Sequence, residues 1–156
     1  MLLPFFEWCE ASFIGQTIRD SLWLFPVIES VHLLALTVIG GSLLIVDLRL
    51  LGVGLRQPTH EIARDARPFL IASLAVMVAT GISLFLSESI KCYYSNAFWW
   101  KMTFLPLALL FTFTIRQRVV RRKDHEIRPM VGKLVALMSI ALWFGVAAAG
   151  RWIGFS

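Results

Sequence analysis

The sequence predicts an all-α membrane protein: four transmembrane helices in a bundle, preceded by an amphipathic helix that lies on the membrane surface. Hydrophobic residues make up 58% of the 156-residue chain and the mean hydropathy is +0.73, which is more apolar than a soluble domain usually is. Four segments are each apolar over about 20 residues, the length that crosses a bilayer core of about 30 Å. Most basic residues fall in the links between these segments. Together these observations predict one domain, residues 1–156, that spans the membrane four times.

The chain begins with a stretch that is too polar to span the membrane. Aromatic residues recur there at helical spacings, whereas Glu7, Glu10 and Gln16 are polar. This pattern predicts an interfacial helix over about residues 4–18. No Lys or Arg precedes Arg19, and a cleavable signal peptide starts with a basic region, so we expect this helix not to be one.

The four spans follow the interfacial helix in order. The second and third are shorter than the first, so their ends should lie near the interface. Small residues recur every four positions in the second and fourth spans, which favours close packing in a compact bundle or a dimer. We place the spans at about Leu22–Val46, Phe69–Leu86, Phe98–Ile115 and Met130–Ala149.

The distribution of charge predicts which way the chain crosses the membrane. The first link, Asp47–Pro68, and the third link, Arg116–Lys133, together hold 11 of the 15 Lys and Arg residues. Basic links stay on the cytoplasmic side of a membrane. We therefore expect a multi-pass membrane protein with both links in the cytoplasm and both termini outside, which is the periplasm if the host is a Gram-negative bacterium. An aromatic belt is expected on that side, formed by Trp8, Trp23, Trp99, Trp100 and Trp152.

The first span contains a carboxylate and an imidazole, in the stretch FPVIESVHLLAL (residues 25–36). Glu29 and His32 are three residues apart, so they lie about 60° apart on one face of a helix. An isolated ionised group inside a membrane is costly, so both side chains should face the bundle and have partners. Two interpretations stay open: a polar lock between helices, or a binding site for a ligand.

The other three spans each bring polar residues toward the same side of the membrane. We expect these residues to form one polar cluster with Glu29 and His32, and they are Glu88, Asn96, Lys101 and Arg151. The alternative for Lys101 and Arg151 is that their long side chains reach the aqueous interface without a partner inside the protein.

His32 is the candidate metal or haem ligand. Glu-x-x-His occurs once, whereas the di-iron site of helical bundles uses it twice with further carboxylates. Copper is an option because imidazole and thioether ligands suit it, and Met102 is expected at a depth near that of His32, although methionines in apolar helices are usually packing residues. A b-type haem could take His32 as one axial ligand, but His60 and His125 fall in the cytoplasmic links.

No motif indicates an enzyme or a nucleic-acid-binding protein. The chain has no nucleophile–base pair, P-loop, Gly-rich dinucleotide loop or HExxH motif. We therefore expect no catalytic residue. The basic third link is accounted for by topology and by attraction to anionic lipid headgroups.

An ion pair is expected at the cytoplasmic exit of the first span. Asp47 and Arg49 are the candidate inner-end ion pair. Asp47 has Arg67 and Arg116 as alternative partners across the bundle. A helix end that is simply solvated is equally consistent with these residues.

Two cysteines are expected on the outer side of the membrane. An oxidising compartment would allow Cys9 and Cys92 to form a disulfide between the N-terminal helix and the second link. Their distance does not follow from the sequence.

Four stretches between Arg19 and Phe155 carry a resemblance to a known family: RDSLWLFPVIESVHLLALTVIGGSLLIVDLRLLG, TGISLF, NAFWWKM and AAAGRWIGF. Through them the chain is similar to a group of small bacterial inner-membrane proteins of unknown function. The resemblance implies a four-helix membrane protein and no established activity. The residues that mark it here are Glu29, His32, Asp47, Arg49, Asn96, Lys101, Gly150 and Arg151.

A looser similarity connects the chain to bacterial copper-resistance membrane proteins of the copper-uptake type. It depends on a helix with a His, a helix with the pair TG and a third helix with a Lys. The chain lacks the other helices of those larger proteins and their His/Met-rich periplasmic domain. A copper function is therefore only suggested by this similarity.

Three functional hypotheses follow. The first is a non-catalytic accessory or structural subunit of a membrane redox or transport assembly. The second is a protein that binds haem or copper at His32. The third is a small proton-coupled or cation transporter that uses Glu29 and His32, and it would need to be an oligomer because one short chain has little room for a pathway. The expected partners are the lipid bilayer and either further copies of the chain or other membrane subunits.

Overall fold

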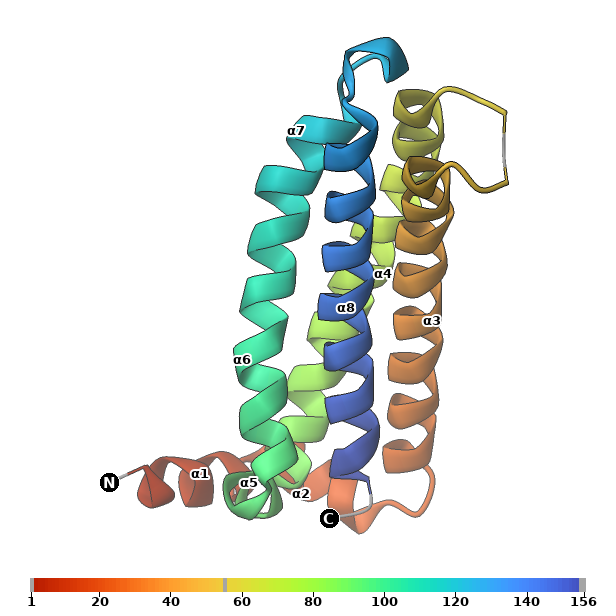
Figure 1. Cartoon of the computed structure of the whole chain (residues 1–156). Coiled ribbons are helices and arrows are strands. Elements are labelled where there is room, and N and C mark those ends of the chain that lie inside the picture. Colours follow the sequence, from red (N-terminus) through yellow and green to blue (C-terminus); the bar gives the residue numbers. More distant parts are fainter. Residues whose placement is uncertain (1, 55, 155–156) are drawn as a thin grey trace.

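The computed structural model describes residues 2–54 and 56–154, which form an all-α bundle (Figure 1). Four spans in it are long and apolar enough to cross a membrane, so the predicted fold class is confirmed. The third span, Asn96–Val120, consists of three consecutive segments. From the N-terminus, the segments of the four spans are α3 (Leu24–Leu51), α4 (Thr59–Ser87), α6 (Asn96–Phe111) with the π-helical η1 (Thr112–Arg116) and α7 (Gln117–Val120), and α8 (Pro129–Ile153).

The helices extend beyond the apolar segments that hydropathy detects. Helix α4 begins at Thr59 rather than near Phe69, and α8 continues to Ile153 rather than ending near Ala149. Hydropathy identifies only the part of a helix that lies in hydrocarbon, whereas backbone hydrogen bonding continues until a cap or a breaker ends it. Helix α3 stops before Gly52, whose φ of +85° is the left-handed conformation that favours glycine at a helix C-terminus.

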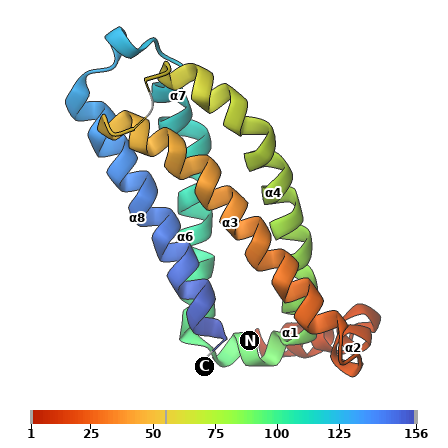
Figure 2. The same cartoon turned by 90° about the vertical axis from the view of Figure 1, so that its right-hand side faces the viewer.

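The N-terminal segment forms two helices rather than the single one expected over residues 4–18. Helices α1 (Leu3–Glu10) and α2 (Phe13–Asp20) are separated at Ser12. The Ser12 Oγ accepts a hydrogen bond of 3.2 Å from the N–H of Gly15, so Ser12 is the N-cap of α2. Both helices lie across one end of the bundle (Figure 2), where α1 packs beside α5 (Ser89–Tyr94) and α2 packs on α4.

The two ends of the bundle differ in charge. Both chain termini lie at the same end, together with α1, α2 and α5, and we call it the terminal end (Figure 1). The opposite end carries the links from α3 to α4 and from α7 to α8, and we call it the basic end. These links and the adjoining helix turns hold 11 of the 15 Lys and Arg residues. The charge asymmetry seen along the sequence therefore separates the two ends of the molecule.

Side chains from all four spans meet in one hydrophobic core, which includes Ile39, Leu43, Met77, Ala108, Trp143 and Val146. Helix α3 packs along both α4 and α8, and α6 packs along α8. Gly145 of α8 lets the Phe104 ring of α6 approach closely, because a Cβ on Gly145 would lie 3.3 Å from Cδ1 of that ring. This glycine therefore serves a helix contact inside the bundle.

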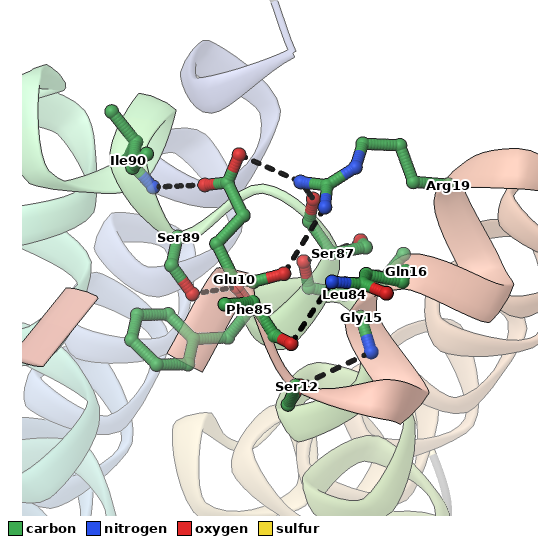
Figure 3. Close-up of polar contacts among 11 residues, drawn as sticks. Glu10, Ser12, Gly15, Gln16, Arg19, Leu84, Phe85, Ser87, Ser89 and Ile90 are labelled. Carbon is green, nitrogen blue, oxygen red and sulfur yellow. Dashed lines mark hydrogen bonds and ion pairs between the residues drawn. The ribbon is translucent and has the colours of Figure 1, made fainter. Parts of the chain in front are cut away.

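One carboxylate attaches the N-terminal helices to the terminal end of the bundle (Figure 3). The Glu10 Oε2 accepts a hydrogen bond of 2.6 Å from the backbone N–H of Ile90, in the first turn of α5. The Arg19 Nη1 lies 2.7 Å from Glu10 Oε1 and also donates to the Ser87 carbonyl at 3.2 Å. Glu10 thereby connects α1, α2 and the junction of α4 with α5.

Aromatic packing supports the same attachment. The Phe6 ring of α1 lies 5.4 Å from that of Phe85 and 5.2 Å from that of Tyr93, both in edge-to-face orientations. Phe85 and Phe98 stack on each other with ring centroids 5.6 Å apart. Such ring pairs add about 0.5–1.5 kcal/mol each to the free energy gained from burial.

Replacing Gly15 by Ala should displace the N-terminal helices. A Cβ at this position would overlap the backbone carbonyl of Leu86 in α4, which cannot move aside as a flexible side chain can. We expect a loss of about 1–3 kcal/mol in the free energy of unfolding, as for other overpacked sites. Thermal unfolding in detergent and the rate of proteolysis within α1 and α2 measure the change.

The matched control is Gly40→Ala in the middle of α3, where a Cβ would meet nothing within 4 Å. This variant should be neutral or slightly more stable, because alanine is the better helix former. Equal destabilisation by the two substitutions would contradict the close contact between Gly15 and α4.

Candidate functional site

A polar network is buried inside the bundle toward its basic end. Asp47 of α3, Arg116 of η1 and Ser139 of α8 are 1%, 5% and 0% exposed. The Arg116 Nε donates to Asp47 Oδ1 at 2.8 Å, and the Ser139 Oγ donates to Asp47 Oδ2 at 2.6 Å. One carboxylate therefore connects the first, third and fourth spans. We call Asp47, Arg116 and Ser139 the buried triad.

Further hydrogen bonds within the bundle support the buried triad. The Arg116 Nη2 donates to the Leu43 carbonyl at 3.1 Å, and the Trp143 Nε1 donates to Thr112 Oγ1 at 3.0 Å. In the described part of the chain, every buried side-chain nitrogen and oxygen has a hydrogen-bond partner. A buried ion pair needs such bonding, because the loss of hydration otherwise outweighs the attraction between the charges.

The third span departs from α-helical geometry where it meets the buried triad. Thr112–Arg116 form a π-helical segment, and Thr112 and Arg116 are its two buried residues. A π turn has hydrogen bonds between residues five apart, and such turns recur at functional sites. Here the π turn carries the two side chains that bond to α3 and α8.

Asp47 and Arg49 have different partners, in place of the inner-end ion pair expected between them. Side chains two residues apart on a helix point about 160° away from each other, so these two cannot meet. Asp47 points into the bundle toward Arg116, one of the alternatives that the sequence left open. Arg49 points to the surface, where it donates to the Gln57 carbonyl at 2.8 Å and pairs with Asp124 at 3.1 Å.

Asp124 joins the two links of the basic end. Its Oδ1 accepts a hydrogen bond of 3.0 Å from the N–H of Thr59, in the first turn of α4, and its Oδ2 accepts one of 3.1 Å from Arg49. Partial burial acts to raise the pKa of Asp124, but the hydrogen bonds to Thr59 and the nearby charge of Arg49 outweigh it and lower the pKa. The carboxylate therefore caps α4 as an anion.

His32 faces the bundle, whereas Glu29 is exposed on the outside of α3. His32 is 9% exposed, and its Nδ1 lies 2.9 Å from Thr80 Oγ1 of α4. The Thr80 hydroxyl donates to the Val76 carbonyl at 2.7 Å, so its oxygen accepts a hydrogen bond from the Nδ1–H of His32. The ring lies against Gly81, where a Cβ would be 3.3 Å from Cε1. His32 thus connects α3 to α4, the span that the buried triad does not reach.

Lys101 of α6 reaches into the bundle near the terminal end. Its Nζ lies 3.6 Å from the position that a Cβ on Gly150 of α8 would occupy. Neither a hydrogen bond nor an ion pair joins Lys101 to another described residue. The Lys101 side chain therefore packs against α8.

The other members of the expected outer cluster lie at the surface. Glu88 pairs with Lys91 of α5 at 3.7 Å, and both side chains are exposed. Asn96 is exposed at the start of α6, and Arg151 is exposed near the end of α8. The cluster predicted from the sequence is thus divided between the interior and the surface of the terminal end.

The described residues do not converge on a metal site. Among them, no group of three or more His, Cys, Asp or Glu side chains is placed to hold an ion. Met102, the candidate thioether ligand, is 39% exposed on α6. His60 in the first turn of α4 and His125 in η2 (Asp124–Glu126) both belong to the basic end. The haem and copper hypotheses for His32 stay predictions.

Cys9 and Cys92 are buried free thiols, and the disulfide that an oxidising compartment would allow between them is not formed in this structure. Cys92 packs beside Phe6 and Phe98. Burial, with a smaller effect from the charge of Glu88, raises the pKa of the Cys92 thiol to about 11. Helix α1 packs directly on α5. In place of a disulfide, aromatic contacts join the N-terminal segment to the second link.

Several residues of the polar network were missed by sequence reasoning. Ser139, Thr112 and Trp143 are single polar groups within apolar segments. A hydroxyl in such a position usually bonds to a carbonyl of its own helix, so its presence alone does not indicate a contact with another helix. The useful signal was Arg116, a cation at the inner end of a span, which the sequence did relate to Asp47.

A family described as a family of unknown function (DUF6644) matches residues 5–156. This match confirms that the chain resembles an uncharacterised family, and it covers the buried triad, His32 and Lys101. Phe155, in the last motif that carried the resemblance, lies outside the described residues. No curated protein and no solved structure matches the chain.

Replacing Arg116 by Met should destabilise the bundle strongly. Asp47 would stay buried without its counterion, and removing one partner of a buried ion pair costs about 3–5 kcal/mol. Graded denaturation in detergent micelles, followed by circular dichroism, measures the loss.

The control is the double variant Asp47→Leu with Arg116→Met, which removes both charges. Because apolar replacement of a whole buried pair is often neutral or stabilising, the double variant should recover most of the stability. A double variant as unstable as Arg116→Met would show that the unpaired charge of Asp47 is not the cause.

The contacts of Asp124 should make the start of α4 sensitive to acid. The pKa of Asp124 is lowered on folding, so its contribution to stability is present above its unfolded pKa of 3.8 and is lost as the pH falls through the lower folded value. At neutral pH, Asp124→Asn should expose the backbone amides of this turn to faster hydrogen exchange than in the wild type, and the two proteins should converge in acid. A difference that persists below about pH 2 would contradict a dependence on ionisation. Asp65→Asn, at an exposed acid in the same helix, is the control.

Proposed function

The chain belongs to this family of unknown function across residues 5–156, and from that premise we propose that it is a non-catalytic structural subunit of a membrane redox or transport assembly. The observation that carries the proposal is the buried triad. Its ion pair and hydrogen bonds are directed at neighbouring helices of the same chain. The polar groups inside the spans therefore hold the bundle in one arrangement.

The state of the charges supports a structural role for them. Ionisable residues inside a membrane usually belong to a reaction or transport path. In this chain Asp47 and Arg116 neutralise each other, and Ser139 and the Leu43 carbonyl supply further bonds. A residue that handles substrate must exchange its partners during turnover. The partners of Asp47 and Arg116, in contrast, are fixed parts of the fold.

The outward side of α3 supports docking to a second membrane subunit. Gly40 and Gly41 stand near the middle of the helix, and a Cβ on either would meet nothing within 4 Å. Glycine inside a helix is less stable than alanine by about 1 kcal/mol, and no contact within the described chain requires it at these positions. Small residues on the outside of a span let another helix approach closely.

We place this subunit in a bacterial inner membrane, with the basic end in the cytoplasm and both termini in the periplasm. The support is the concentration of Lys and Arg at the basic end. Exposed tryptophans of an aromatic belt belong to the terminal end, namely Trp8, Trp23, Trp99, Trp100 and Trp152. The neighbouring subunit is either a further copy of this chain or a different membrane protein.

Replacing Gly41 by Leu should dissociate the chain from its neighbours. The added side chain would hold an approaching helix away from α3, and we expect association to weaken about tenfold, which corresponds to about 1.4 kcal/mol. Cross-linking in the membrane, followed by the mass of the gently extracted complexes, measures the change. Ala148→Leu adds bulk at an exposed position of α8 and should leave the complexes intact.

Two results would argue against this function. One is a wild-type chain that is monomeric in its own membrane. The other is a Soret band or stoichiometric copper in the purified protein that is lost in His32→Ala, which would favour the ligand-binding hypothesis. Uptake into liposomes that fails in Glu29→Gln would favour transport in the same way.

A further inference from the structure

A cleft opens between the second and third spans at the basic end. Its volume is about 310 Å³, and it lies between the first turns of α4 and the segments η1 and α7, with α3 as a further wall. A cavity of this size is at the lower limit of sites for small molecules, which occupy about 300–1,000 Å³. It has room for a lipid headgroup.

The charged groups that line this cleft are all arginines, namely Arg64, Arg67, Arg116 and Arg121, and His60 lies beside them. None of the described residues in its lining is acidic. The Nη2 of Arg121 donates a hydrogen bond of 2.8 Å to the amide oxygen of Gln117, and this bond holds Arg121 in place. The Nε of Arg64 lies 3.5 Å from Oδ1 of Asp65, and both side chains are exposed. Arg67 makes no ion pair with a described residue. The cleft therefore has an excess of positive charge.

Arg116 belongs both to the buried triad and to the lining of the cleft. Its Nε and Nη2 bond to Asp47 and to the Leu43 carbonyl. Its Nη1 has no bond to a described residue, so this nitrogen is available to an acceptor in the cleft. An anionic oxygen there would complete the bonding of the guanidinium.

The remaining walls of the cleft are largely apolar and include Val46, Leu70, Phe113 and Val120. Phe113 is exposed on the outside of the third span, which in a membrane is the lipid-facing surface. Positive charge at the membrane boundary and apolar walls below it match a molecule with an anionic head and a hydrocarbon tail.

We propose that this cleft binds the phosphate of an anionic phospholipid from the leaflet at the basic end. Guanidinium groups match the geometry of phosphate oxygens, and Arg67, Arg121 and Arg116 would contact them from three segments. The apolar walls would receive the first part of the acyl chains. Basic pockets between transmembrane helices bind lipid headgroups by the same chemistry. The site shares Arg116 with the buried triad, but it does not rest on the proposed structural function.

Native mass spectrometry of the full chain in detergent tests this site. The probes are phosphatidylglycerol and phosphatidylcholine with identical acyl chains. The wild type should retain phosphatidylglycerol about 25-fold better, and Arg67→Gln with Arg121→Gln should lose that preference, because each of the two basic contacts contributes about 1 kcal/mol, or about fivefold. The control, Arg118→Gln with Arg122→Gln, removes the same charge from the same end at residues outside the cleft. It should change retention by about twofold or less.

The outcomes separate a lipid site from its alternatives. A lipid site is supported if only the cleft variant loses the preference for phosphatidylglycerol and if the wild type keeps that preference in millimolar inorganic phosphate. Equal loss in both double variants would show diffuse surface attraction and overturn the site. Displacement of the lipid by inorganic phosphate would also overturn it, because the cleft would then hold soluble phosphate. Circular dichroism checks the fold, and the single variant Arg67→Gln decides by the same criteria if the double variant unfolds.

Discussion

The ion pair between Asp47 and Arg116 is the interaction on which the arrangement of the spans depends. Between helices in lipid, hydrophobic burial gives little preference for one rotation over another, so packing and polar contacts decide it. Asp47 accepts bonds from η1 and from α8 at once, which sets the rotation of three spans at one depth. Helix α4 has no member in this triad, and it is positioned by packing along α3 and by the bond between His32 and Thr80.

The two ends of the bundle are held together by different forces. At the terminal end, Glu10 and a set of packed aromatic rings attach α1 and α2 to α5 (Figure 3). At the basic end, Asp124 joins the links, but Arg67 and most neighbouring cations have no acidic partner among the described residues. Unpaired positive charge at a membrane surface is favourable when anionic lipid is present. The cleft beside Arg116 connects that surface to the buried triad.

Much of the fold could be predicted because a bilayer constrains a chain strongly. The spans follow from apolar length, and the separation of the two ends follows from the positions of Arg and Lys. The ends of helices did not follow, since Thr59 begins α4 within a polar segment and Ser12 divides the N-terminal helix. Of the candidate site, Glu29 and His32 were correctly placed on one helix, but only His32 faces the interior. Rotation about the helix axis separates the two, and neighbouring helices determine that rotation.

By itself, the sequence determined the class of protein, the number of spans and the end at which positive charge gathers. These properties depend on composition and length, which no packing arrangement can change. Only the tertiary structure decided that Asp47 meets Arg116 and Ser139 rather than Arg49, and that His32 faces the interior while Glu29 faces outward. The physical reason is that a contact between helices requires matching depth and rotation in both partners. Apolar segments permit many such matches, and only the packing of the whole bundle selects one.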